Sequence, residues 1–126
     1  MSKILVAEDN LGTADMLKAL LELEGYEVIT TGTPDTVIPL MTEERPNMLL
    51  IDFHLGQSSS TSVLRAIRKD PRLQHTPIVV VSGMECGWEA EKAGANSFLL
   101  KPFSVDSLLA VLREHLGNPQ QHETAP

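Results

Sequence analysis

The stretch Asn-Met-Leu-Leu-Ile-Asp-Phe-His-Leu-Gly, residues 47–56, decides the fold because its run of four apolar residues ends abruptly in one carboxylate, Asp52. A short apolar run that follows Pro46 and precedes a Gly/Ser-rich segment predicts a fully buried strand. The last residue of such a strand lies at its carboxyl end, where open parallel sheets carry their chemistry. The alternative is an aspartate that only starts a turn, which is common after a strand. The rest of the chain decides between these two roles for Asp52.

The overall composition indicates a single globular domain. The chain has 126 residues, 42% of them hydrophobic and 21% charged, which is enough for one core and too little for two. The formal net charge of −7 argues against binding to a nucleic-acid backbone. We expect neither a signal peptide nor a membrane span, because Met1 to Lys3 lead directly into a short apolar run. The single cysteine, Cys86, permits no internal disulfide and favours a cytoplasmic location.

Five apolar runs predict strands, and a helical pattern follows each of them. The strands are expected at residues 4–7, 27–31, 47–52, 77–81 and 96–100. The helices are expected at residues 11–24, after Pro34, after the flexible polar segment 58–61, at 85–93 and after the capping residue Ser104. Such alternation specifies an α/β fold, a parallel sheet with helices on both faces.

Two of these helices contain residues that weaken them. Pro39 lies inside the second helix and is expected to kink it or delay its start, and Gly87 interrupts the helix at 85–93. Residues 118–126 are polar and carry no period, so we expect a domain at 1–117 followed by a flexible polar tail or the start of a linker.

Polar side chains follow the predicted strands at corresponding positions. They are Glu8 and Asp9, Thr31 and Gly32, Asp52, Ser82, and Lys101. Because right-handed crossovers put all strand carboxyl ends along one edge of a parallel sheet, we expect these side chains to lie close together. Clustered carboxylates favour a cation, and their hard oxygen ligands suit Mg²⁺. With Lys101 and the Ser82 hydroxyl nearby, Asp52 can act as a nucleophile toward a phosphoryl donor.

The same residues resemble a known family. The motifs are Glu8-Asp9, the strand-end Asp52, Ser82-Gly83, Ala93-Gly94-Ala95 and Lys101-Pro102-Phe103. Together they are similar to the receiver domain of two-component response regulators, of the single-domain, chemotaxis-regulator-like kind. The resemblance covers about residues 2–117 and implies a flavodoxin-like (β/α)5 fold, a doubly wound five-stranded sheet in the order 2-1-3-4-5.

The resemblance implies an acceptor and a metal site. Asp52 is expected to accept a phosphoryl group from a histidine kinase or a histidine phosphotransfer protein. Glu8, Asp9 and Asp52, together with the backbone carbonyl of His54, are expected to hold Mg²⁺. The protein would then be a regulator that catalyses its own phosphorylation and dephosphorylation rather than a metabolic enzyme.

The resemblance also implies a switch. Lys101 is expected to pair with the phosphoryl oxygens, and Ser82 is expected to move to contact them. Phe98 falls where the family keeps an aromatic residue that rotates inward as that hydroxyl moves. The surface of the fourth helix, fifth strand and fifth helix would then change and meet a downstream protein or a second copy of the chain, with no direct contact to nucleic acid or membrane.

Three positions depart from the family pattern or modify it. Gly56 stands where many members have Pro, and Ser60 stands where many have Gly, so we expect the loop from Gly56 to Thr61 to be more mobile or differently shaped. His54 lies two positions after Asp52, where side chains can face the site, and we expect it to modulate dephosphorylation.

Ordinary structural roles remain open for several of these residues. Ser82 can simply cap the fourth helix, Lys101 can be a surface lysine, and Phe98 can be plain core. Cys86 and Trp88 are expected to be structural, although an exposed Trp88 would suit a partner surface. The remaining histidines share no metal-ligand spacing and receive no role. They are His75, His115 and His122.

Three other functions compete with a phosphorylated switch. A Mg²⁺-dependent phosphatase with an Asp nucleophile typically carries a second acid where this chain has His54. A flavin-binding electron carrier needs a phosphate cradle after the first strand, and Glu8-Asp9 has the wrong charge. A receiver-like interaction module that works without phosphorylation is the third, and the full set of acids, hydroxyl and lysine argues against it.

Overall fold

A five-stranded parallel sheet forms the middle layer of the protein in the computed structural model, which describes residues 1–117. The strands are β1 (Lys3–Ala7), β2 (Glu27–Thr31), β3 (Met48–Asp52), β6 (Ile78–Ser82) and β7 (Ser97–Leu100). Their order in the sheet is β2-β1-β3-β6-β7, so the predicted α/β fold and its 2-1-3-4-5 order are confirmed.

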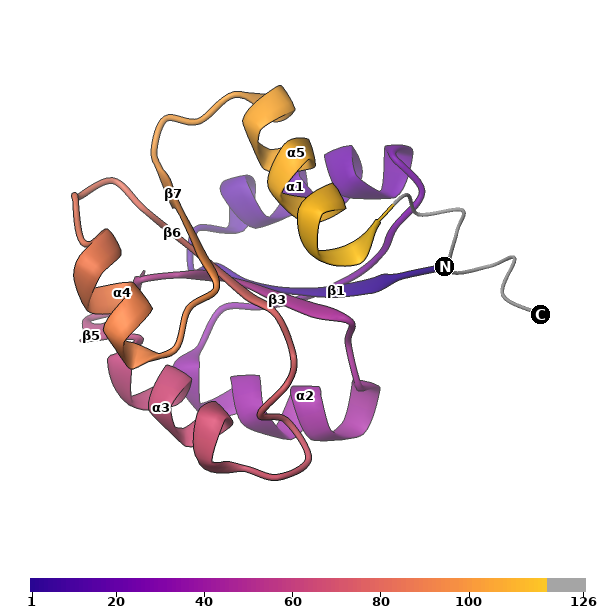
Figure 1. Ribbon diagram of the computed structural model, residues 1–126. Coiled ribbons are helices and arrows are strands. Elements are labelled where there is room, and N and C mark those ends of the chain that lie inside the picture. Colours follow the sequence, from indigo (N-terminus) through magenta and orange to yellow (C-terminus); the bar gives the residue numbers. More distant parts are fainter. Residues whose placement is uncertain (118–126) are drawn as a thin grey trace.

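Helices cover both faces of this sheet (Figure 1). They are α1 (Leu11–Leu23), α2 (Val37–Glu44), α3 (Thr61–Lys69), α4 (Gly87–Ala93) and α5 (Val105–Leu116), with a short 3-10 helix η1 (Pro34–Thr36) before α2. Figure 1 shows α1 and α5 on one face and α2, α3 and α4 on the other. No helix among residues 1–117 is long and apolar enough to cross a membrane.

Each face of the sheet has its own apolar core, because successive side chains of a strand point to opposite faces. Leu49 and Ile51 of β3 pack under α2, α3 and α4, whereas Met48 and Leu50 pack under α1 and α5. All five residues of β3 are buried, as expected for the central strand of a doubly wound sheet.

Local sequence signals explain where most helices begin. The side chains of Asn10 and Ser104 cap α1 and α5 by accepting from the amides of Thr13 and Ser107. Pro39 is the third residue of α2, in the first turn, where a backbone N–H has no partner within the helix. The α-helix starts at Val37 and the residues after Thr33 form the 3-10 helix η1 instead, which is the expected delay. Helix α4 begins at Gly87, two residues later than predicted.

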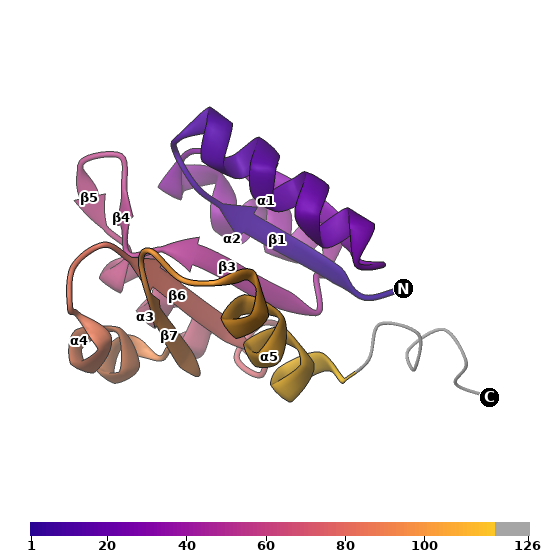
Figure 2. The same ribbon diagram turned by 90° about the horizontal axis from the view of Figure 1, so that it is seen from above.

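The segment after β3 differs from the flexible polar loop that the sequence suggested. His54–Leu55 (β4) and Ser58–Ser59 (β5) pair as a small antiparallel sheet, and Figure 2 shows this hairpin projecting beyond the five-stranded sheet. Ser60 precedes α3 but its side chain does not cap the helix. The predicted tail or linker at 118–126 lies outside the described residues, and the domain boundary at 117 stays a prediction.

Arg68 of α3 ties the amino-terminal ends of β6 and β7 together. Its guanidinium donates to the carbonyls of Gly94, Gln74 and Thr76 at 2.8–2.9 Å. It also donates to the side chain of Asn96 at 2.6 Å. Gly94 has a φ of 122°, and a Cβ built there would lie only 2.6 Å from Cγ of Arg68. Glycine at 94 is therefore required both by the backbone and by the fixed arginine.

Replacement of Gly94 by alanine is expected to lower the free energy of unfolding by about 2–4 kcal/mol, because strain at positive φ adds to overpacking. Gly56→Ala is the matched control, since Gly56 also has positive φ (66°) but no atom within 4 Å of a built Cβ. Its expected loss is about 1 kcal/mol. Urea unfolding measures both free energies. Equal losses would show that Arg68 moves aside without cost, and would contradict the overpacking.

Candidate functional site

Lys101 connects two buried acids at the carboxyl edge of the sheet. Its Nζ lies 2.6 Å from Oδ2 of Asp52 and 3.1 Å from Oε1 of Glu8. Glu8 follows β1, Asp52 ends β3 and Lys101 follows β7, so the parallel topology brings three strand ends together. Glu8 is 4% exposed and Asp52 8%. One ammonium group thus supplies charge-assisted hydrogen bonds to both carboxylates.

Backbone amides hold the remaining carboxylate oxygens. Oδ1 of Asp52 accepts from the amide of His54 at 3.0 Å, and Oε2 of Glu8 accepts from the amide of Asn10 at 3.1 Å. The second acid of the pair, Asp9, reaches the hairpin instead, where its Oδ2 accepts from the amide of Gly56 at 3.1 Å. The three acids are therefore oriented before any ligand binds.

Burial and the shared lysine set the charge states of this cluster. Burial raises the pKa of Glu8, and the hydrogen bonds from Asn10 and Lys101 offset only part of that effect. For Lys101, burial alone would lower the pKa, but the hydrogen bonds to Asp52 and Glu8 outweigh it and the pKa is raised. Lys101 is therefore a fixed positive charge at physiological pH.

Ser82 ends β6 at the same edge but does not contact the acids. Its Oγ accepts from the amide of Met84 at 3.1 Å and neighbours the thiol of Cys86. The backbone carbonyl of Ser82 accepts from the amide of Lys101 at 2.7 Å. The residue directly before α4 is Cys86 and not Ser82. Capping of α4 therefore does not explain why the Ser82 hydroxyl is buried here.

Phe98 and His54 lie at the margins of the cluster. Phe98 is partly buried against the core under α4, where a Cβ on Gly87 would lie 3.3 Å from its ring. The His54 side chain is exposed, and its ring meets Phe53 edge to face with centroids 5.1 Å apart. The structure brings Glu8, Asp52 and Lys101 into direct contact and leaves the side chains of Ser82, Phe98 and His54 outside this contact.

Ser60 is a site residue that the sequence analysis missed. Its buried Oγ donates to the backbone carbonyl of Asp52 at 2.7 Å, and its amide donates to the carbonyl of Phe53 at 2.7 Å. Serine in place of the family's usual glycine predicts a more mobile or differently shaped loop but does not predict this contact. The hydroxyl closes the hairpin onto the strand end.

The donor set fits a hard divalent cation. Within residues 1–117, no three His, Cys, Asp or Glu side chains are already gathered as a metal site. Two carboxylates, Glu8 and Asp52, nevertheless share one ammonium group at this edge, and Asp9 directly follows Glu8 in the chain. Carboxylate and carbonyl oxygens are the ligands that Mg²⁺ prefers. The assignment of Glu8, Asp9, Asp52 and the His54 carbonyl to Mg²⁺ stays a prediction.

The other residues singled out from the sequence lie away from the acids. Trp88 on α4 is 67% exposed, with Nζ of Lys92 4.3 Å from its ring centre. Cys86 is buried, and burial raises the pKa of its thiol. His115 joins α5 to β7 through a 2.8 Å hydrogen bond between its Nε2 and Oγ of Ser97. His122 lies outside the described residues.

Comparison with known proteins identifies the architecture. The family model for the response regulator receiver domain matches residues 4–113. The chain is 27% identical over 118 residues to the polar-differentiation response regulator DivK of Brucella anthropi, an alignment that covers 91% of this chain and 96% of that protein.

Solved structures are similar over nearly the whole chain. The receiver domain of the sensor histidine kinase PA1611 from Pseudomonas aeruginosa, which holds a magnesium ion in its active site cleft, is 26% identical with a TM-score of 0.83 and covers 92% of this chain and 98% of its own. A CheY-like receiver domain from Methanospirillum hungatei is 26% identical with a TM-score of 0.85, covering 97% and 98%.

Replacement of Ser60 by alanine is expected to lower the free energy of unfolding by about 1 kcal/mol, because the buried carbonyl of Asp52 loses its donor. Ser62→Ala, on the exposed surface of α3, is the control and should change stability by less than about 0.5 kcal/mol. Chemical denaturation distinguishes the two, and indistinguishable variants would contradict a stabilising role for the Ser60 hydroxyl.

The raised pKa of Glu8 predicts a pH-dependent difference between wild type and Glu8→Gln. Ionised Glu8 opposes folding at neutral pH, and this cost disappears as the pH falls through its folded pKa, above the ordinary 4.5. Wild type should therefore gain stability relative to Glu8→Gln between neutral pH and about pH 5, measured by urea unfolding in EDTA. The exposed Glu43→Gln is the control. A loss of wild-type stability relative to Glu8→Gln over this pH range would contradict a raised pKa for Glu8.

Proposed function

Because the chain belongs to the response regulator receiver domain family and is a receiver of two-component signalling, we propose that it is switched by transfer of a phosphoryl group to Asp52. The observation that supports this is the contact of 2.6 Å between Lys101 and Asp52 at the carboxyl edge of the sheet. That contact places a fixed positive charge where a phosphoryl group on Asp52 would bring negative charge.

In the proposed reaction a carboxylate oxygen of Asp52 attacks the phosphorus of a phosphohistidine. The new P–O bond forms as the P–N bond breaks, and the imidazole leaves with the electron pair. Lys101 exchanges its bond to Oδ2 for one to a phosphoryl oxygen. The amide of His54 keeps Oδ1 oriented throughout. Hydrolysis of the acyl phosphate by water then restores the carboxylate.

Glu8, Asp9, Asp52 and the carbonyl of His54 are the residues that would hold Mg²⁺. Bound there, the ion would neutralise charge on the transferring group. Asp9 accepts the Gly56 amide through Oδ2, and a carboxylate can accept such a bond and ligate a metal at the same time, while Glu8 and Asp52 share Lys101. The same Asp9 side chain would then contact both the hairpin and the ion.

A shallow, mostly apolar hollow beside Lys101 supports a protein as the phosphoryl donor. It lies between α1 and the segment after β7, with Met16, Leu17 and Phe103 in its lining, and has a volume of about 460 Å³. A histidine kinase or a histidine phosphotransfer protein docked here would bring its phosphohistidine to Asp52. Under this proposal the protein acts in the cytoplasm.

The signal would leave through α4, β7 and α5. Ser82 has to release the amide of Met84 to reach a phosphoryl oxygen, which would loosen the chain before α4. Phe98 packs against the start of the same helix. Exposed apolar side chains already mark this surface, with Trp88 67%, Leu100 45% and Val105 46% exposed. A downstream protein or a second copy of the chain is the proposed partner.

Incubation with acetyl phosphate and Mg²⁺ tests the proposal by intact-mass spectrometry. Wild type should gain one phosphoryl group, EDTA should prevent the gain, and Asp52→Asn should stay unmodified. A phosphohistidine protein is the second donor for comparison. If neither donor modifies wild type, the protein is a receiver-like interaction module that works without phosphorylation.

The exposed imidazole of His54 is expected to shorten the life of phospho-Asp52, because it can hydrogen-bond the attacking water. His54→Ala should therefore lengthen the half-life severalfold, as followed by mass spectrometry after removal of the donor. His75→Ala, exposed in the segment between α3 and β6, is the matched control and should leave the half-life unchanged. An unchanged half-life in His54→Ala would contradict the role.

A further inference from the structure

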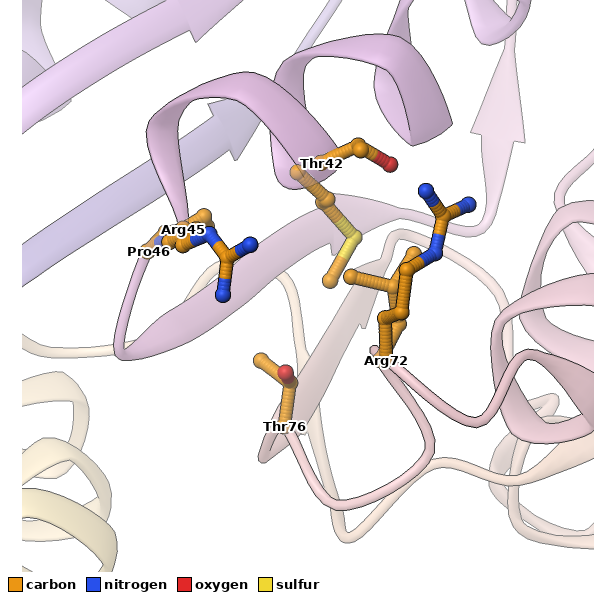
Figure 3. A pocket seen from close by; sticks show the side chains of 7 residues that line it. Thr42, Arg45, Pro46, Arg72 and Thr76 are labelled. Atoms are coloured by element: carbon orange, nitrogen blue, oxygen red, sulfur yellow. The ribbon is translucent and has the colours of Figure 1, made fainter.

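A second hollow lies at the amino edge of the sheet, opposite the strand ends that carry Asp52. It has a volume of about 180 Å³ and is bounded by the end of α2 and by the segment between α3 and β6. Pro46 and Thr76 line it just before β3 and β6 begin, which places it away from the carboxyl edge. Figure 3 shows Arg45 and Arg72 on opposite sides of this hollow, with Thr76 below.

The two arginines leave hydrogen-bond donors free at the hollow. In the part of the chain that the structure describes, no hydrogen bond or ion pair engages the guanidinium of Arg45, which points toward the centre in Figure 3. Arg72 uses Nε and Nη2 to bind Asp70 at 3.1 and 2.9 Å, so its Nη1 hydrogens remain. Two arginines against one aspartate make a local positive excess in a chain of net charge −7.

The backbone conformation of Arg45 is a second indication that its side chain has a role in binding. Arg45 follows α2 with φ 50° and ψ 58°, the only non-glycine residue at positive φ within residues 1–117. A helix end of this geometry favours glycine or asparagine, and an arginine held there is strained. Strain of this kind concentrates at ligand sites. The long arginine side chain does not stabilise this helix end, and it extends toward the hollow.

The remaining lining is mixed. Thr42 and Thr76 bring hydroxyl groups to the hollow, and the other lining residues, Met41, Pro46 and Leu73, are largely buried. Guanidinium groups recognise carboxylates and phosphates through paired N–H donors, so the accessible groups of this hollow suit an anionic headgroup.

We propose that this hollow is a binding site for a small anion, whose carboxylate or phosphate group lies between Arg45 and Arg72, close to Thr76. The site is separate from the edge that carries Asp52. Anion binding and phosphorylation can therefore occur on the same molecule.

Titration of the ¹⁵N-labelled full chain with butyrate and with inorganic phosphate tests the proposal, with sodium chloride at equal ionic strength as the reference. Saturable amide shifts are expected at residues 41–46 and 72–76. Arg45→Gly and Arg72→Gln should each weaken binding about tenfold or more. Arg65→Gln, on the exposed surface of α3, should bind as wild type does. Tighter binding of butyrate or of phosphate identifies the headgroup.

Arg45→Gly also separates binding from folding. Glycine suits the positive φ at 45, so its melting temperature should equal or exceed that of wild type while binding is lost. The proposal is overturned if neither probe gives saturable shifts, if the shifts fall only around Asp52 and Lys101, or if Arg45→Gly binds as tightly as wild type.

Discussion

The structure depends on a single ammonium group shared between two buried carboxylates. Glu8 and Asp52 arrive from neighbouring strands, β1 and β3, and each would carry an uncompensated charge without Lys101. Breaking this arrangement is costly because both carboxylates are largely removed from water. Under the proposed function, the lysine that pairs with Asp52 would also stabilise a phosphoryl group formed on that carboxylate.

The hairpin after β3 gives the site of this chain contacts that depend on its own residues at 56 and 60. Ser60 binds the backbone of Asp52, and the amide of Gly56 binds Asp9, so the hairpin is held at its turn and at its end to the acidic edge. A proline at 56 would have no N–H to offer Asp9. The two departures from the family pattern therefore act together. The loop that was expected to be more mobile or differently shaped is a structured hairpin.

Much of this could be predicted from the sequence. Asp52, Glu8 and Lys101 each follow a strongly apolar or β-branched run, and parallel topology requires such ends to meet. The hairpin could not be predicted, because Ser58 and Ser59 have no strand pattern and pair only through the turn at Gly56. The contact from Ser60 to a backbone carbonyl has no sequence signal. The positive φ at Arg45 has no sequence signal either, because glycine or asparagine is the usual residue at such a helix end.

A double-mutant cycle of Lys101→Met and Asp52→Asn, measured by urea unfolding, tests most directly whether this shared ammonium organises the site. A coupling free energy of about 1–3 kcal/mol between the two side chains is expected, since Lys101→Met leaves the buried Asp52 carboxylate without its ammonium partner and Asp52→Asn leaves Lys101 with Glu8 as its only acidic partner. Losses that add to within about 0.5 kcal/mol would contradict it. In that case Asp52 would be held by the backbone of the hairpin alone.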